Sequence, residues 1–541
     1  MNIPFKESPV EFDQRLLFPS NIFDLLPDDH ECYLYNDIFQ QLDTSSLENK
    51  YSRRGQNAYH PKSILSILIY SYTRGIFSSR QIERRCNEDL SFMYIAGMNC
   101  PNFRVLSDFR KNNSEYFHEC FKQSVLIAME LGLASLGHVS LDGSKFKANT
   151  SKHKAMSHKR LVEKEKELME EIDSLIEKAN KCDKEEDKEY KEKTGYEIPE
   201  DLKHKEERLA KIKKAKEALE KREEELNPGK EIEGKKQISF TDTDARIMGK
   251  KGNFDYQYNG QIAVDSDNQI IIAQHLSQNA NDKKEIELAL KNMKETTGTL
   301  PSKLSTDNGY MSGTNLGTLE EEPNIDVYIA TDKGEKKNII PLNESNRKLV
   351  KADFVYNKQD DCFTCPGGQT LVLKSESKDG RKTYQGSSTI CAACCYNSRC
   401  CKSAKGRART ICTDDKEPLR QRMNAKMESE AAKKIYGKRK VIVEPVFGQI
   451  KNSGFRGFSV RGHEKTCGEF SLVCTAHNIK KIMKAILKGV LGPESDKLVP
   501  KPAQCEGTWQ ISNVKALLNI MFLHICPQFI TATICTRSRR G

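Results

Sequence analysis

Residues 138–149 read HVSLDGSKFKAN, and this stretch decides the fold class that we predict. Apolar and polar side chains alternate up to Leu141, which is typical of a β-strand. The next residues, Asp142 and Gly143, favour a turn and predict that the strand ends there. Carboxylates at the ends of neighbouring strands can converge on one point, so Asp142 is the first candidate site residue.

The chain downstream predicts further strands. FDYQYNGQIAVDS and NQIIIAQHLS flank a short Asp/Asn turn and predict a β-hairpin. A helical stretch, DKKEIELALKNMKE, precedes two more strands, KLSTDNGY and IDVYIAT. In the first of these, Asp307 again lies where an apolar strand meets a Gly-containing turn. The order of these elements predicts an α/β fold with a mixed sheet and helices against it.

Helical patterns precede and interrupt this sheet. Between residues 57 and 113, apolar side chains recur with a period of 3.6 after His60-Pro61, and Arg104, Arg110 and Lys111 are expected at the surface of a small helical unit. Such a unit suits either DNA binding or an ordinary helical bundle. From Lys159 to Glu225 the chain is rich in Lys and Glu, with leucines at heptad-like spacing. This pattern predicts an antiparallel helical hairpin that ends at Asn227-Pro228-Gly229.

Bulk composition limits the class of protein. The 541 residues carry a formal net charge of +11, which permits a polyanionic partner. The start of the chain has no secretory signal pattern. The 18 cysteines therefore indicate a reducing cytoplasm rather than a disulfide scaffold. The apolar run 514–535 contains a lysine, a histidine and a proline, so we expect no membrane span.

A cysteine cluster follows the last predicted strand. Two Cys-x-x-Cys pairs, Cys362/Cys365 and Cys391/Cys394, are typical of a four-thiolate Zn²⁺ site in a ribbon-like fold. Cys400 is an alternative fourth ligand. The basic residues beyond it are a candidate DNA contact: Lys402, Lys405, Arg407 and Arg409. A structural loop without a DNA role fits the same pattern.

A third acid lies late in the chain, in KKIYGKRKVIVEPVFGQIK, which predicts a helix carrying Glu444. Carboxylates from two strand ends and one helix suit the chemistry of phosphodiester transfer. That chemistry uses two divalent ions about 4 Å apart, one at the attacking and one at the leaving oxygen. Each acid alone is more often a turn or surface residue.

YGKRKVIVEPVFGQIK resembles the Tyr–Arg–Glu–Lys signature of bacterial insertion-sequence DDE transposases, with Tyr436, Arg439, Glu444 and Lys451 at the signature positions. Arg439 lies one residue further from Glu444 than in the common pattern, which leaves Lys440 as an alternative. Four other segments resemble the same family: HPKSILSILIYSYTRGIFSSRQIE, SFTDTDARIMGKKGNFDYQYNGQIAVD, STDNGYMS and CTAHNIKKIMK. The resemblance runs from roughly Phe12 to Leu487.

The resemblance implies a ribonuclease-H-like core, with Asp142, Asp307 and Glu444 as catalytic ligands of Mg²⁺ or Mn²⁺. Tyr436, Arg439 and Lys451 would lie near the DNA. The implied partners are double-stranded DNA, both element terminal repeats and target, and a second copy of the chain. The implied location is the bacterial cytoplasm, at the nucleoid. A nuclease that does not join strands, or an inactive DNA-binding remnant, are the alternatives.

These expectations divide the chain into seven segments. Residues 1–130 form a helical DNA-binding domain. The core is made of residues 131–158, 231–345 and 416–490. Its two insertions are the charged hairpin, 159–230, and the Cys-rich segment, 346–415. The tail, 491–541, has no assigned role and resembles nothing in the family.

Overall fold

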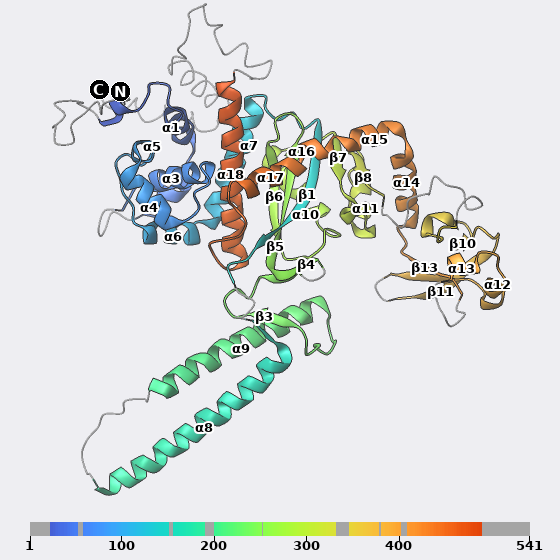
Figure 1. Cartoon of the computed structure of the whole chain (residues 1–541), viewed down its shortest axis with the longest axis horizontal. Coiled ribbons are helices and arrows are strands. Elements are labelled where there is room, and N and C mark those ends of the chain that lie inside the picture. The colour runs from blue at the N-terminus through green and yellow to red at the C-terminus, as the bar shows by residue number, and fades with distance from the viewer. Residues whose placement is uncertain are drawn as a thin grey trace, which may run out of the picture. The chain divides into compact units, whose positions relative to one another are not determined.

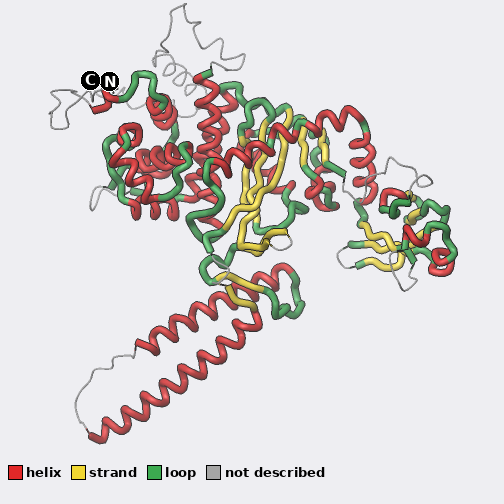
Figure 2. The backbone as a smooth tube through the Cα atoms, in the orientation of Figure 1, coloured by secondary structure: helices red, strands yellow, loops and turns green. Residues whose placement is uncertain are grey.

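In the computed structural model, the described residues are 22–51, 58–150, 155–189, 200–250, 253–331, 346–377, 380–401 and 408–488. They belong to two compact units: residues 1–133 with 475–541, and residues 134–474. Helix α18 (His463–Leu487) contributes its first half to the second unit and its second half to the first. Figure 1 gives the element labels, and Figure 2 separates helices from strands along the backbone.

The first unit is helical, as predicted. Its elements are η1 (Ile22–Leu25), α1 (Cys32–Gln41), α2 (Ser45–Glu48), α3 (Pro61–Thr73), α4 (Ser79–Glu88), α5 (Leu90–Ile95), α6 (Phe103–Asn112) and α7 (Ser114–Glu130). Helix α3 begins where His60-Pro61 predicted, because the His60 ring accepts the N–H of Lys62 and Pro61 needs no hydrogen-bond acceptor. Helix α6 begins after Asn102, whose side chain accepts the N–H groups of Arg104 and Val105.

The expectation that Arg110 lies at the surface is wrong. Its side chain is 4% exposed and donates to the Tyr72 hydroxyl (3.0 Å), the Phe77 carbonyl (2.7 Å) and the Ser79 hydroxyl. Arg110 therefore joins α6 to α3 and α4. A buried cation of this kind is held by hydrogen bonds to polar groups, and it is not available to DNA.

The second unit is built on a mixed sheet. In the described part of this unit, six strands pair in the order β4-β5-β1-β7-β8, and β6 also pairs with β5. They are β1 (His138–Lys147), β4 (Arg246–Lys250), β5 (Asn253–Asp265), β6 (Ile271–Ser277), β7 (Lys303–Thr306) and β8 (Asp326–Ile329). The predicted β5–β6 hairpin is confirmed. Strands β7 and β8 run parallel to β1, whereas β5 is antiparallel to it.

The predicted end of β1 at Asp142-Gly143 is wrong. The strand continues to Lys147 because residues 143–147 pair with residues 257–261 of β5. Strand β7 behaves differently: it pairs only with residues 138–141 of β1 and ends at Thr306. Asp142 thus lies one residue beyond the last β1–β7 pair, beside Asp307. The strand end that brings the two acids together belongs to β7.

Helices of this unit lie between the later strands of the sheet and after its last strand in sequence. They are α10 (Ile286–Thr297), η3 (Asn308–Tyr310), α11 (Gly313–Glu320), α14 (Glu417–Glu428), α15 (Glu430–Gly437), α16 (Arg439–Ile442) and α17 (Glu444–Asn452). The predicted single helix around Glu444 is therefore three short ones. Glu444 is the first residue of α17, and Pro445 follows in the first turn, where a missing N–H costs nothing.

The predicted helical hairpin is confirmed. Helices α8 (His158–Glu189) and α9 (Glu200–Leu226) are antiparallel, and the short strands β2 (Ala155–Ser157) and β3 (Gln237–Ser239) pair at its base. Lys216 forms an ion pair with Glu165, and Lys205 forms one with Glu171. Residue numbers therefore increase along one helix and decrease along the other, as in an antiparallel pair. Apolar residues from both helices and from β3 share one core: Leu161, Leu168, Ile212, Ala215, Leu219 and Ile238.

Residues 355–413 form a second, antiparallel sheet in the order β13-β12-β11-β10-β9. Its elements, with the preceding turn η4, are η4 (Lys351–Asp353), β9 (Val355–Asn357), β10 (Cys362–Thr364), β11 (Thr370–Glu376), β12 (Lys382–Gln385), α12 (Ser388–Ala392), α13 (Asn397–Cys400) and β13 (Thr410–Thr413). Phe363 and Tyr384 anchor its core. Among the described residues, no helix has the length and apolarity needed to cross a membrane. The apolar run 514–535 and the tail lie outside them.

Candidate active site

The three predicted acids come from two adjacent parallel strands and one helix. Asp142 is on β1, Asp307 follows β7, and Glu444 opens α17. One cation joins two of them. Arg439 lies 2.7 Å from Asp142 Oδ2 through Nη2 and 3.2 Å from Glu444 Oε1 through Nη1. Both contacts form although Arg439 lies five residues before Glu444, across the boundary between α16 and α17.

Each strand acid is also held by a backbone N–H. The N–H of Gly143 donates to Asp142 Oδ1 at 2.9 Å, and the N–H of Gly309 donates to Asp307 Oδ1 at 2.8 Å. Burial raises the pKa of Asp142 to about 6, although Arg439 opposes this rise. Burial likewise raises the pKa of Asp307, again against the pull of Arg439. The site thus concentrates carboxylates in a poorly solvated place and partly neutralises them with one guanidinium.

The other two signature residues, Lys451 and Tyr436, contact different strands. Lys451 reaches β1, where its ammonium donates to Ser144 Oγ at 2.5 Å and lies 5.3 Å from the centre of the Phe146 ring. Burial lowers the pKa of Lys451. Tyr436 instead packs with Tyr328 of β8, and burial raises its pKa. Lys440, the alternative to Arg439, is exposed, whereas Arg439 is 7% exposed and contacts the acids.

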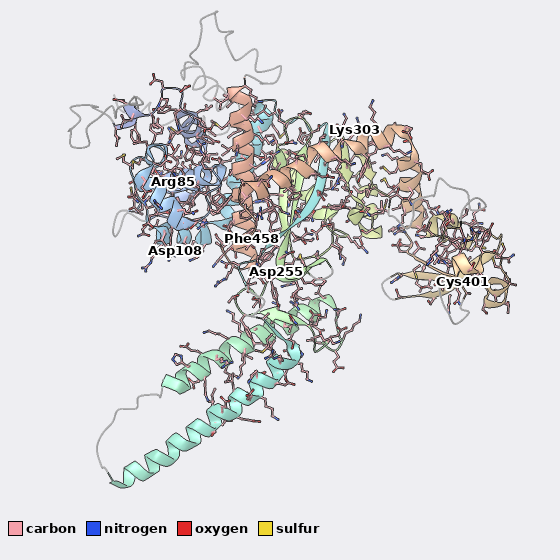
Figure 3. The ribbon with its side chains drawn as sticks, in the orientation of Figure 1. Arg85, Asp108, Asp255, Lys303, Cys401 and Phe458 are labelled. Atoms are coloured by element: carbon pink, nitrogen blue, oxygen red, sulfur yellow. The ribbon has the colours of Figure 1, made fainter. Side chains whose placement is uncertain are left out.

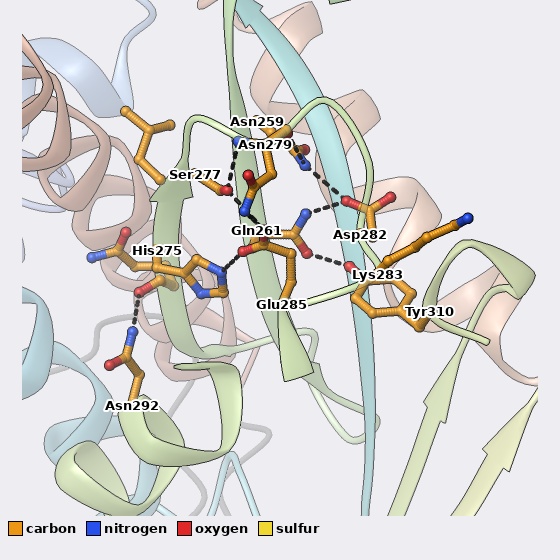
Figure 4. Close-up of polar contacts among 12 residues, drawn as sticks. Asn259, Gln261, His275, Ser277, Asn279, Asp282, Lys283, Glu285, Asn292 and Tyr310 are labelled. Atoms are coloured by element: carbon orange, nitrogen blue, oxygen red, sulfur yellow. Dashed lines mark hydrogen bonds and ion pairs between the residues drawn. The ribbon is translucent and has the colours of Figure 1, made fainter. Parts of the chain in front are cut away.

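A fourth carboxylate, Asp282, was missed from the sequence. Its Oδ1 accepts the side-chain N–H groups of Asn259 (2.8 Å) and Gln261 (2.6 Å), and the Tyr310 hydroxyl donates to Gln261 Oε1 (Figure 4). Asp282 precedes α10, in a stretch that predicts only a helix start. The hydrogen-bond partners that mark it are on β5, some twenty residues earlier, so no local pattern indicates it.

Asp282 borders the turns that carry both strand acids. A Cβ atom on Gly143 would lie 2.9 Å from Asp282 Oδ1, and one on Gly309 would lie 3.3 Å from Asp282 Oδ2. Glycine at both positions lets the Asp282 carboxylate approach the backbone beside Asp142 and Asp307. This carboxylate therefore lies against the two glycines whose N–H groups bind Asp142 and Asp307.

The side chains that line a small cavity of about 40 Å³ in the second sheet include five cysteines: Cys365, Cys391, Cys394, Cys400 and Cys401. Backbone N–H groups donate to two of these sulfurs, Gln369 to Cys365 (3.3 Å) and Tyr396 to Cys394 (3.4 Å). Cys362 does not line the cavity. Side chains alternate along β10, so Cys362 points away from the face that Phe363 gives to the core.

The basic flank of this cluster is only partly described. Arg409 turns inward, donating to the Cys400 carbonyl at 3.0 Å and lying over the Phe354 ring. Lys402, Lys405 and Arg407 lie outside the described residues. Across the described residues, no three His, Cys, Asp or Glu side chains are arranged to hold a metal ion as they stand.

Comparison with known proteins gives two matches to family models. Residues 364–483 match a model described as a transposase DDE domain, and residues 20–112 match one described as a transposase domain (DUF772). The first match includes Arg439, Glu444 and Lys451; Asp142 and Asp307 lie outside both. No curated protein matches the chain.

Among solved structures, the chain is similar to the piggyBac transposase in a synaptic complex with hairpin DNA, determined by cryo-EM. The identity is 10% and the TM-score 0.21, over 88% of this chain and 86% of that one. The two matched segments, one in the N-terminal helices and one around Glu444, together support a transposase with a DDE domain.

Proposed function

We propose that this chain is a bacterial insertion-sequence transposase that cleaves DNA and joins its ends with Asp142, Asp307 and Glu444. The observation that carries the proposal is the meeting of Asp142 and Glu444 at one buried cation, Arg439, with Asp307 directly after the adjacent strand, β7. Buried carboxylates repel one another and cost free energy unless positive charge balances them. Asp142 and Asp307 are partly buried and Glu444 is exposed, so the cost falls on the first two acids, and keeping them beside a third favours a site for cations.

Mg²⁺ or Mn²⁺ is the cofactor that we infer. The donor chemistry fits, because these ions prefer carboxylate oxygens together with water and phosphate. Two of the acids already face one positive group, the Arg439 guanidinium, and a divalent ion would take over its role of neutralising them. When bound, such ions supply the charge that stabilises the attacking and leaving oxygens of the phosphodiester.

The chain's own residues hold and orient this site. The N–H groups of Gly143 and Gly309 fix one oxygen each of Asp142 and Asp307. Lys451, which donates to Ser144 two residues along β1, would contact a phosphate of the strand that is cut. The reaction needs no protein nucleophile, so we expect no covalent bond between protein and DNA.

We infer that the mixed sheet is a ribonuclease-H-like core. Three features support this: an antiparallel β5–β6 hairpin beside β1, two parallel strands on its other side, and acids on β1 and after β7. On this proposal, the helical hairpin and the Cys-rich sheet are insertions in the core. The matched N-terminal helices would bind the terminal repeats. Two ends must be held together, so we expect a dimer during the reaction.

We also propose a structural Zn²⁺ site in the second sheet. The cavity-lining cysteines favour Cys365, Cys391, Cys394 and Cys400 over the set predicted with Cys362. N–H groups that donate to the Cys365 and Cys394 sulfurs suit thiolates, whose negative charge strengthens such bonds. The five cavity-lining cysteines are free thiols, the form from which zinc thiolates arise.

The test uses a plasmid that carries the gene with its flanking DNA. Asp142→Asn, Asp307→Asn and Glu444→Gln should each abolish Mg²⁺-dependent cleavage at the element ends while DNA binding persists. Glu287→Gln, an exposed acid on α10, is the matched control and should cleave normally. Full activity in any of the three variants would refute the assignment. Strand transfer of pre-cut ends separates a transposase from a nuclease that does not join.

A further inference from the structure

A basic groove in the second unit lies where β1 ends. The groove, of about 460 Å³, is lined by three cations, three side chains with hydroxyl or amide groups, and no acid. The polar lining residues are Lys147, Asn149, Thr150, Thr241, Arg456 and Arg461. Phe458, labelled in Figure 3, also contributes to the lining. Cations together with neutral hydrogen-bond donors are the side chains that bind phosphate oxygens.

The groove is rigidly built. The N–H of Lys147 donates to the Arg456 carbonyl at 3.1 Å, and the N–H of Phe458 donates to the Lys147 carbonyl at 2.9 Å. A Cβ atom on Gly457 would lie 2.8 Å from that carbonyl, so glycine permits this close approach. The Phe458 ring packs against Phe455 with centroids 5.5 Å apart. The cations therefore project from a fixed backbone.

The cations have spare binding capacity. Arg461 donates through Nε to the Asn149 carbonyl at 2.9 Å, which leaves its two terminal nitrogens for a ligand. In the described part of the chain, no carboxylate pairs with Arg456 or Arg461, and both are exposed. Lys147 pairs with Asp255 at 3.1 Å but remains 60% exposed. The groove thus has unbalanced positive charge that favours an anionic ligand.

The groove lies at the end of the same strand, β1, that carries Asp142. Asp142 and Lys147 are five residues apart on β1, so their Cα atoms are about 17 Å apart at the usual rise per residue, and their side chains leave opposite faces of the strand. Lys451 lies between them, at Ser144. On the same edge of β1, β7 ends beside Leu141 and residue 457 bridges to Lys147. The separation corresponds to about five nucleotide steps along one strand of a duplex.

We propose that this groove binds the phosphate backbone of DNA about five nucleotides from the bond that is cut. The inference rests on the proposed function, because the groove has a distance from a cut bond only if DNA binds at the three acids. It assigns Arg456 and Arg461 to phosphate contacts and not to base recognition. Their contribution to binding is therefore independent of DNA sequence and falls steeply with salt.

The test measures binding of a fluorescein-labelled duplex of random sequence by full-length protein carrying Asp142→Asn, at several salt concentrations. Each lost phosphate contact lowers the slope of log affinity against log salt by about 0.9, so Arg456→Ala with Arg461→Ala should lower it by about 2. The affinity near 0.1 M salt should fall about 10- to 100-fold. The control, Lys291→Ala with Arg422→Ala, removes two exposed cations elsewhere in the same unit and should keep the wild-type slope.

An unchanged slope in the double variant, or an equal fall in the control, would overturn the proposal. The proposal is also overturned if inorganic phosphate displaces the duplex more than another salt does at the same ionic strength, because that result indicates a site for a small anion. If the double variant fails to fold, Arg456→Glu alone provides the test, since the structure assigns that side chain no role in folding. Wild-type plasmid cleavage is measured separately. Cleavage with an unchanged slope refutes only the groove, whereas a lowered slope without cleavage refutes only the nuclease chemistry.

Discussion

Replacing Asp282 by Ala removes the acceptor for two amides whose residues are fully buried, Asn259 and Gln261. The Gln261 Nε2 group has Asp282 as its acceptor at 2.6 Å, while Asn259 also reaches the Asn279 carbonyl at 3.2 Å. A buried donor without an acceptor costs about 1–3 kcal/mol. With one amide unpaired and a second weakened, the loss should be about 2–4 kcal/mol of the free energy of unfolding.

Asp282→Asn is the matched control, because it keeps an oxygen for both amides and removes only the charge. Thermal melting should show a drop of roughly 3–6 °C for Asp282→Ala and little change for Asp282→Asn. If Asp282 acts by positioning the turns at Gly143 and Gly309, Asp282→Ala should also lose about 100-fold in cleavage rate, whereas Asp282→Asn keeps most of it. A melting temperature for Asp282→Ala equal to that of the wild type would refute this reasoning.

Four further predictions concern charge and metal. Because burial raises the pKa of Asp142 to about 6, the cleavage rate should rise with pH through this value. A higher Mg²⁺ concentration should move this rise to lower pH, because the ion favours the ionised carboxylate. A rise that stays at the same pH contradicts this. Without metal, the same shift contributes stability that is present below pH 3.8 and lost as the pH rises through about 6, measurable by denaturant unfolding. Arg439→Ala should lower the melting temperature of the metal-free protein. Mg²⁺ should raise the melting temperature of this variant by more than that of the wild type, since the ion replaces the lost charge. An equal rise in both proteins contradicts the idea that Mg²⁺ takes over the role of Arg439. Purified protein should release one Zn²⁺ per chain to a chromogenic chelator, and Cys394→Ser should lose it while Cys362→Ser retains it.

Local patterns in the sequence predicted the elements whose stabilising partners are close along the chain. Helix α3 begins at His60-Pro61 because the His60 ring accepts an N–H of the first turn and Pro61 has no N–H that needs an acceptor. Heptad-like leucines gave the α8–α9 hairpin, and the Asp/Asn turn gave β5–β6, because each buries its own apolar face against its neighbour. Asp307 was placed correctly at a strand end for the same reason. The choice of the three acids as a catalytic site came from resemblance and stays a prediction.

Tertiary structure decided what depends on partners far away in sequence. Strand β1 runs through Asp142-Gly143 because β5 pairs with residues 143–147, and this outweighs their local preference for a turn. Arg110 is buried because acceptors from α3 and α4 surround it. Asp282 lies near the two acids because side-chain amides on β5 donate hydrogen bonds to it. Propensity acts over a few residues, whereas hydrogen-bond partners and burial are supplied by the whole fold, so only the fold could place these side chains.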